Sequence, residues 1–158
     1  MNITVKPTQK EINEFVLDLI EFMGKHFSAY FDKTRVAGGN EGVSIRIRRA
    51  VSESELEITT DRLDPIFELG GIQWRFRHSL ASKEELFARM LSDLVGVFTD
   101  KITVVYGYSG EARLGGFRCR GAPDAEALNA FKDAHPDCDR LTMKVWTEPE
   151  STISLPGT

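Results

Sequence analysis

The chain has 158 residues, of which 41% are hydrophobic and 28% charged, and its formal net charge is −4 at pH 7. A chain of this length and composition can bury a core without disulfides or metals, which excludes wholesale disorder and favours a single domain. The acidic balance argues against a surface that binds nucleic acid over its whole extent and leaves room only for a local basic patch.

The two cysteines, Cys119 and Cys138, have no C-x-x-C spacing, so they favour reduced thiols over a disulfide framework or a zinc site. The first residues lack the basic segment, apolar run and cleavage site of a signal peptide. No stretch reaches the roughly 18 apolar residues of a membrane span. We therefore expect a cytoplasmic protein that carries no metal or cofactor.

The first predicted element is an amphipathic helix over residues 8–32. It would begin at a capping box formed by Thr8 and Glu11, directly after Pro7. Its apolar residues recur at spacings of three and four, and they are Ile12, Phe15, Val16, Leu19, Ile20, Met23, Phe27 and Phe31. The glycine-rich stretch that follows, residues 33–42, is predicted to be a loop.

A β-hairpin is predicted next, from the alternating runs VSIRIRR, which starts at Val43, and ELEITT, which starts at Glu55. One face of the hairpin is apolar, so the other face carries the charged side chains. A pairing that sets Arg48 opposite Glu55 also sets Arg46 opposite Glu57, which gives two favourable cross-strand pairs.

The second half of the chain has the clearest order of elements. A strand IQWRFRH from Ile72 precedes a helix over 82–98, whose cap is formed by Ser82 and Glu85. The strands KITVVYGY and RLGGFRCR follow, then a shorter helix over 123–134 and the strand RLTMKVW.

The resulting order β-α-β-β-α-β over residues 72–147 predicts a ferredoxin-like arrangement, in which the helices cover one face of an antiparallel sheet. The N-terminal helix and β-hairpin would extend this unit, so residues 1–147 are predicted to form a single α+β domain. Residues 148–158 are predicted to be a flexible C-terminal tail.

The predicted elements, read from the N-terminus, come in the order helix, three strands, helix, two strands, helix. This order resembles the topology of class I type III secretion chaperones, which are small acidic proteins. The resemblance lies in element order, and it implies a protein that holds an extended segment of a secreted partner on apolar strands or in helix grooves.

The strands IQWRFRH and RLGGFRCR place arginines between residues that are expected to face a core. Because side chains alternate along a strand, these arginines would point the other way. In the ferredoxin-like order the two strands are central neighbours, and Lys144 of the last strand shares their face. The predicted partner-binding residues are therefore Arg75, Arg77, Arg118, Arg120 and Lys144.

Two interpretations of this basic face stay open. In one, Glu55, Glu57 and other acidic side chains neutralise it, and the arginine stems cover apolar surface. In the other, it docks an anionic partner, since a planar guanidinium group suits carboxylate or phosphate. RLGGFRCR is also similar to the central-strand motif of RNA recognition domains, but exposing Phe117 there would turn Arg118 and Arg120 into the core.

No catalytic or metal site is predicted. Cys119 and His78 could meet across neighbouring strands, but both follow the core-facing alternation, where a thiol is usually inert. The segment HPDCD, from His135, offers metal-ligand side chains without a second ligand pair elsewhere, and a polar turn explains it better. Neither GGNEG nor GGFRCRG has the spacing of a phosphate-binding loop.

The expected function is therefore that of a non-enzymatic cytoplasmic protein, of a bacterial type, that binds another protein. Toxin-neutralising immunity proteins and secretion chaperones are the two examples, and in an immunity protein an acidic surface would block a basic toxin. The alternative is binding of an anionic ligand or nucleic acid through the basic face. An enzyme whose site has no sequence motif is a third hypothesis.

Overall fold

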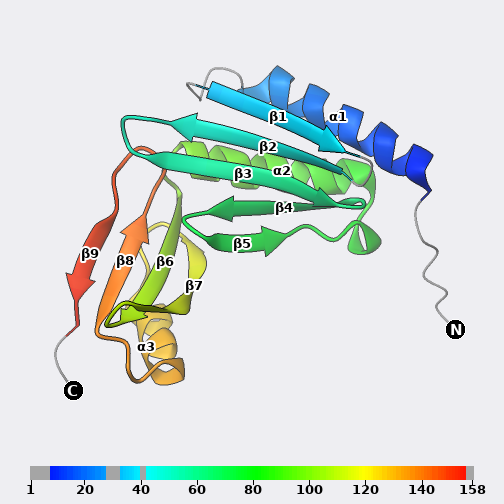
Figure 1. Ribbon diagram of the computed structural model, residues 1–158. Coiled ribbons are helices and arrows are strands. Elements are labelled where there is room, and N and C mark those ends of the chain that lie inside the picture. The colour runs from blue at the N-terminus through cyan, green and yellow to red at the C-terminus, as the bar shows by residue number, and fades with distance from the viewer. Residues whose placement is uncertain (1–7, 28–32, 40–41, 156–158) are drawn as a thin grey trace, which may run out of the picture.

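The computed structural model describes residues 8–27, 33–39 and 42–155 of the chain. They form helices and two antiparallel sheets, so the fold is α+β, as predicted (Figure 1). The helices are α1 (Gln9–Phe27), α2 (Lys83–Phe98) and α3 (Ala125–Ala134), with a short 3-10 helix at His78–Leu80. None of the helices in this described part is long and apolar enough to cross a membrane.

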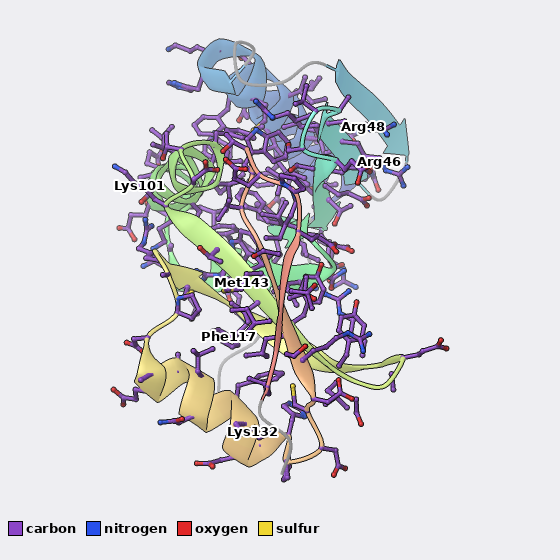
Figure 2. All side chains as sticks on the ribbon, turned by 90° about the vertical axis from the view of Figure 1, so that its left-hand side faces the viewer. Arg46, Arg48, Lys101, Phe117, Lys132 and Met143 are labelled. Atoms are coloured by element: carbon purple, nitrogen blue, oxygen red, sulfur yellow. The ribbon has the colours of Figure 1, made fainter. Side chains whose placement is uncertain are left out.

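The first sheet has the strand order β1-β2-β3-β4-β5, and each strand pairs antiparallel with the next along the chain. Its strands are β1 (Lys33–Gly39), β2 (Gly42–Arg49), β3 (Ser54–Asp61), β4 (Asp64–Leu69) and β5 (Ile72–Arg75). The hairpin prediction is confirmed in β2 and β3, where Arg46 lies opposite Glu57 and Arg48 opposite Glu55. Both arginines point outward from the sheet (Figure 2).

Helices α1 and α2 cover one face of the first sheet. Alternate residues of β2 and β3 point to this face, and the two helices meet them with apolar stripes. The fully buried residues include Leu19 of α1, Ile45 and Ile47 of β2, Leu56 and Ile58 of β3, and Met90 and Leu94 of α2. Each such side chain contributes about 1.5–3 kcal/mol through burial. The opposite face carries mostly polar and charged side chains, together with the apolar Ile66 of β4.

The helices begin where their capping residues predict. The hydroxyl groups of Thr8 and Ser82 each accept a hydrogen bond at 3.2 Å from the backbone N–H three residues further on. The carboxylate of Asp124 caps α3 in the same way, through Ala127 N at 2.8 Å. The predicted end of the first helix, at residue 32, lies outside the described residues.

The loop predicted over residues 33–42 is wrong in part, because residues 33–39 form strand β1. Glycines mark only the end of the strand, where Gly39 pairs with Gly42 of β2. Before it, the β-branched residues Thr34 and Val36 suit a strand, and β2 supplies the hydrogen-bonding partner.

The second sheet has the order β7-β6-β8-β9, and its neighbouring strands are antiparallel. Its strands are β6 (Ile102–Ser109), β7 (Ala112–Arg120), β8 (Arg140–Lys144) and β9 (Ser151–Ser154). Helix α3 covers one face, where the ring centroid of Phe131 lies 5.7 Å from that of Phe117. Residues 148–158, for which a tail is predicted, thus contribute the edge strand β9.

The ferredoxin-like strand order predicted for residues 72–147 is not found. That order requires β5 to lie between β7 and β8, but β5 pairs with β4 in the first sheet, and β6 takes the position between β7 and β8. The segment DPIFEL, for which no strand is predicted, forms β4, and the turn at Gly70 and Gly71 places β5 beside it. Such a hairpin closes a much shorter loop than a crossover would.

Candidate functional site

The five basic residues predicted to bind a partner do not lie on one sheet. Arg75 ends β5 in the first sheet and Arg77 follows it, whereas Arg118 and Arg120 belong to β7, and Lys144 to β8, in the second. The predicted common face is therefore wrong, because it depended on the ferredoxin-like strand order. That any of the five contacts a partner stays a prediction.

Arg75 is held by two carboxylates of its own sheet. Its guanidinium group lies 3.0 Å from Asp61 and 3.0 Å from Asp64, and the hydrogen bonds to these two groups raise the pKa of Arg75. Arg77 is exposed beyond the end of the strand. Both arginines are exposed to solvent, but Arg75 is held in two ion pairs.

Arg118 and Arg120 lie where the two sheets meet. The guanidinium carbon of Arg118 lies 5.2 Å from the ring centroid of Trp74, and Arg120 donates to Asp93 of α2 at 3.1 Å. The indole N–H of Trp74 donates to the other oxygen of Asp93 at 3.1 Å. These contacts connect β7, α2 and β5, so they already have a structural role.

Lys144 is buried, with 4% of its surface exposed. Its ammonium group donates to the carbonyl oxygen of Ser52 at 2.8 Å and to that of Glu148. Burial lowers the pKa of Lys144. The side chain therefore joins β8 to the turn between β2 and β3 and does not present its charge on an open surface.

A groove of about 230 Å³ lies beside Lys144, between the outer face of the first sheet and the start of β9. Its floor includes Leu69 and the turn at Gly70 and Gly71. Its walls carry carboxylates from three separate parts of the chain. We call it the acidic groove, and the carboxylates that define it are Glu53, Glu55, Glu57, Glu68 and Glu150.

Strand alternation explains why these glutamates face outward. Glu55 and Glu57 flank the buried Leu56 in β3, and Glu68 lies next to the buried Leu69 in β4. The turn at Gly70 then brings the first sheet close to the second. A β-carbon at that position would lie 3.2 Å from the side chain of Val104 in β6.

Two cations, Lys144 and Arg46, compensate part of this negative charge. Lys144 lines the groove and is attracted by the charges of Glu150 and Glu53. Arg46 lies 3.1 Å from Glu57 and 3.9 Å from Glu55, measured from its Nε atom to the carboxylate oxygens. Glu68 accepts a hydrogen bond from the Gln73 amide at 2.9 Å, which supplies no charge. Within the described part of the chain, no lysine or arginine forms an ion pair with Glu53, Glu68 or Glu150.

Glu150, which lines the acidic groove, is positioned by Tyr106. The hydroxyl of Tyr106 donates to the Glu150 carboxylate, and burial together with this hydrogen bond raises the pKa of Tyr106. The guanidinium carbon of Arg113 lies 4.0 Å from the centroid of the Tyr106 ring, and Arg113 donates a hydrogen bond to the carbonyl oxygen of Gly70. The groove is therefore formed by ordered side chains as well as by the backbone.

The catalytic and metal alternatives gain no support from the geometry. His78 bonds to Asp64, with Nδ1 at 2.5 Å from the carboxylate, whereas Cys119 donates to the carbonyl of Gly121 at 3.5 Å. Burial raises the pKa of the Cys119 thiol, which disfavours the thiolate. In the segment from His135, the Cys138 side chain is buried in the core under α3. Among the described residues, no group of three or more His, Cys, Asp or Glu side chains could hold a metal.

Sequence reasoning found two members of the acidic groove, Glu55 and Glu57, but only as partners of a basic face. Alternation in β4 would have turned Glu68 to the same side, had DPIFEL been assigned as a strand. Glu53 and Glu150 lie outside strands, and no local pattern brings them together.

Comparison of the chain with models of protein families, with curated proteins and with solved structures finds no match. The acidic groove presents carboxylates, which accept hydrogen bonds from cations, and it presents them on walls that belong to both sheets.

Proposed function

We propose that this protein binds another protein, and that a basic surface of that partner docks at the acidic groove. The observation that carries the proposal is the convergence of five glutamates from three parts of the chain, of which Glu53, Glu68 and Glu150 have no ion pair among the described residues. Carboxylates that repel one another are stabilised when lysine or arginine side chains come between them.

The chemistry of the groove favours a protein partner over an anionic ligand. Its volume of about 230 Å³ is below the range of about 300–1,000 Å³ that is typical of drug-sized ligand sites. It is large enough to admit a long basic side chain that projects from a partner's surface. The negative field around it would also steer a basic partner during encounter.

Among the two kinds of protein-binding protein considered, an immunity protein fits the acidic groove better than a secretion chaperone. A chaperone needs a continuous apolar surface for an extended segment. The large exposed apolar residues of the described part lie on separate elements, and they are Leu17, Val51, Leu80, Val95 and Ile153. We therefore propose that this protein neutralises a basic toxin by covering the toxin's basic surface with the acidic groove.

The alternative, binding of an anionic ligand or nucleic acid through an arginine face, has lost its structural premise. It required Arg75 and Arg118 to project from the same face of one sheet, and they belong to two. Arg75 is paired with Asp61 and Asp64, and Arg120 with Asp93. No other described feature of these strands favours that function over the acidic groove.

The test compares two variants that lose the same negative charge. One removes charge from the acidic groove by the changes Glu53→Gln, Glu55→Gln, Glu68→Gln and Glu150→Gln. The other carries Glu84→Gln, Glu111→Gln, Glu126→Gln and Asp133→Asn, all at exposed positions outside the groove. Immobilised wild type and both variants capture proteins from the native cell, and mass spectrometry identifies what each retains.

We expect one basic protein to be retained by the wild type and the control variant and lost by the groove variant. Titration calorimetry with that purified partner should show binding at least about tenfold weaker for the groove variant, and weaker binding as the salt concentration rises. Equal retention by both variants would refute the acidic groove as the docking site. Retention of an acidic protein or of nucleic acid would refute the proposed partner class.

A further inference from the structure

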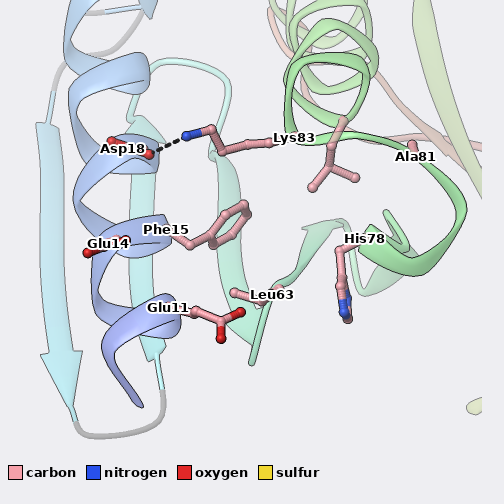
Figure 3. Close-up of a pocket in the computed structure, with 9 residues that line it drawn as sticks. Glu11, Glu14, Phe15, Asp18, Leu63, His78, Ala81 and Lys83 are labelled. Atoms are coloured by element: carbon pink, nitrogen blue, oxygen red, sulfur yellow. Dashed lines mark hydrogen bonds and ion pairs between the residues drawn. The ribbon is translucent and has the colours of Figure 1, made fainter. Parts of the chain in front are cut away.

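A second cavity, of about 270 Å³, lies between the N-terminal half of α1 and the segment that follows β5 (Figure 3). It shares no residue with the acidic groove. Its lining combines apolar side chains with polar groups from α1 and from the region of the 3-10 helix. The volume is below the range of about 300–1,000 Å³ found for drug-sized ligands, so the cavity can admit only a molecule smaller than these.

The apolar part of this cavity is contributed by Phe15, Leu63 and Leu86. Phe15 is fixed by stacking on Phe87 of α2, with ring centroids 5.7 Å apart. Phe22 of α1 also stacks on Phe87, with ring centroids 5.2 Å apart. The cavity therefore offers a rigid aromatic and aliphatic surface, on which a ligand's apolar body would be buried.

His78 is held in a single orientation at the opposite wall. Its backbone N–H donates to Asp64 at 2.9 Å, and its ring Nδ1 lies 2.5 Å from the same carboxylate. Arg75 fixes that carboxylate in turn, at 3.0 Å. In the tautomer whose Nδ1–H donates to Asp64, Nε2 is the hydrogen-bond acceptor of the ring. Nε2 has no hydrogen-bond partner within the described part of the chain.

Glu11 provides a second acceptor. Its carboxylate lies on the side of α1 that faces the gap towards Leu63 and His78 (Figure 3), and its hydrogen-bond donor is the Thr8 hydroxyl, at 3.1 Å. The cation that lines the cavity, Lys83, is engaged by Asp18 at 2.9 Å. The cavity is thus lined by three carboxylates, those of Glu11, Glu14 and Asp18, against one lysine, so its lining carries a net negative charge.

We propose that this cavity binds a small organic cation, a primary ammonium or guanidinium group carried on a short apolar body. The cation donates to the Glu11 carboxylate and to Nε2 of His78, and its apolar body lies against Phe15 and Leu63. A carboxylate or phosphate ligand would meet a lining with more carboxylates than cations and would be repelled. The inference goes beyond the proposed function, because it uses other residues and needs no protein partner.

The test uses three compounds that differ in their polar end group. Phenethylamine carries the cation, 2-phenylethanol is its neutral counterpart, and 3-phenylpropionate is an anion of similar shape. Each is titrated against the full-length protein at neutral pH, and binding is followed by calorimetry and by NMR. We expect phenethylamine to bind at least about tenfold more tightly than the alcohol, and the carboxylate not to bind.

The imidazole nitrogens report the position of the amine in the unaltered protein. The chain has three histidines, His26, His78 and His135. We expect the ¹⁵N resonance of the His78 ring to shift on titration with phenethylamine, and those of His26 and His135 to stay unchanged, since neither lines the cavity. This readout needs no substitution and therefore no assumption about folding.

A matched pair of variants tests the carboxylate. Glu11→Gln removes the charge while keeping a residue that serves the capping box, and Glu21→Gln removes a charge from an exposed position of the same helix, outside the cavity. We expect phenethylamine to bind about tenfold more weakly to the first and unchanged to the second. Equal affinity for amine and alcohol, an unmoved His78 resonance, or no binding of any compound would each overturn the proposal.

Discussion

At the scale of single residues, the carboxylate of Asp64 shows how hydrogen bonds outweigh burial. Asp64 is 8% exposed, and burial alone raises the pKa of its carboxyl. The hydrogen bonds from the backbone and ring of His78 and from Arg75 act in the opposite direction and hold the pKa below its ordinary value of 3.8. The charged form is therefore the one that the fold stabilises.

This shift predicts how stability depends on pH. Because the folded pKa of Asp64 lies below the unfolded one, its contribution is complete above the unfolded pKa and is lost as the pH falls through the folded pKa. We expect Asp64→Asn to lower the free energy of unfolding by about 2 kcal/mol at neutral pH, since it weakens bonds to a charged group. Urea unfolding at pH values from about 2 to 7 measures the difference, which should shrink towards the acid end.

The control for this prediction is Asp61→Asn. Asp61 bonds to the same guanidinium group of Arg75, but its side chain is 56% exposed. We expect it to change stability by less than about 1 kcal/mol. If the two variants were equally stable, or if their difference were the same at every pH, the organising role of Asp64 would be wrong.

At the scale of elements, Asp93 connects three of them. It lies on α2, is 8% exposed, and accepts hydrogen bonds from Trp74 of β5 and Arg120 of β7. We expect Asp93→Ala to destabilise the fold by about 3 kcal/mol, because a buried indole N–H and a guanidinium group lose their acceptor. Denaturant unfolding, followed by tryptophan fluorescence, measures this loss of stability. The control is Asp133→Ala on the exposed face of α3, which we expect to change the free energy of unfolding by less than about 0.5 kcal/mol.

The elements that could be predicted are those whose signals are local. The caps at Thr8 and Ser82, and the alternation that sets Arg46 opposite Glu57, lie within a few residues of the structures they specify. Strands β1, β4 and β9 were missed because glycine, proline or short length obscures their pattern. The pairing of these strands depends on which other strands lie beside them, and the alternation of side chains within one segment does not identify those strands.

At the scale of the whole molecule, the two sheets are joined through contacts between distant parts of the chain. The hydroxyl groups of Ser52 and Ser54 donate to the carbonyl of Trp146 at 2.7 and 2.5 Å, and Lys144 donates to Ser52. This junction brings Glu150 to the groove walls, and it separates the arginines that a single sheet would have kept together. Local sequence patterns therefore could not predict the acidic groove. They could predict that Glu57 points outward from the first sheet.

The packing of β7 against β6 and β5 predicts a position, Gly116, that tolerates no side chain. A β-carbon on Gly116 of β7 would collide with the carbonyl oxygen of Val105 and lie 2.5 Å from the Ile72 side chain of β5. We expect Gly116→Ala to destabilise the fold by about 1–3 kcal/mol, because both the backbone of β6 and the Ile72 side chain of β5 must move to accommodate it. Gly24→Ala should instead stabilise by about 0.5–1 kcal/mol, since α1 has open space there and alanine favours a helix. Thermal unfolding of both variants measures the two effects, and an unchanged melting temperature for Gly116→Ala would mean that β5 and β7 do not meet as described.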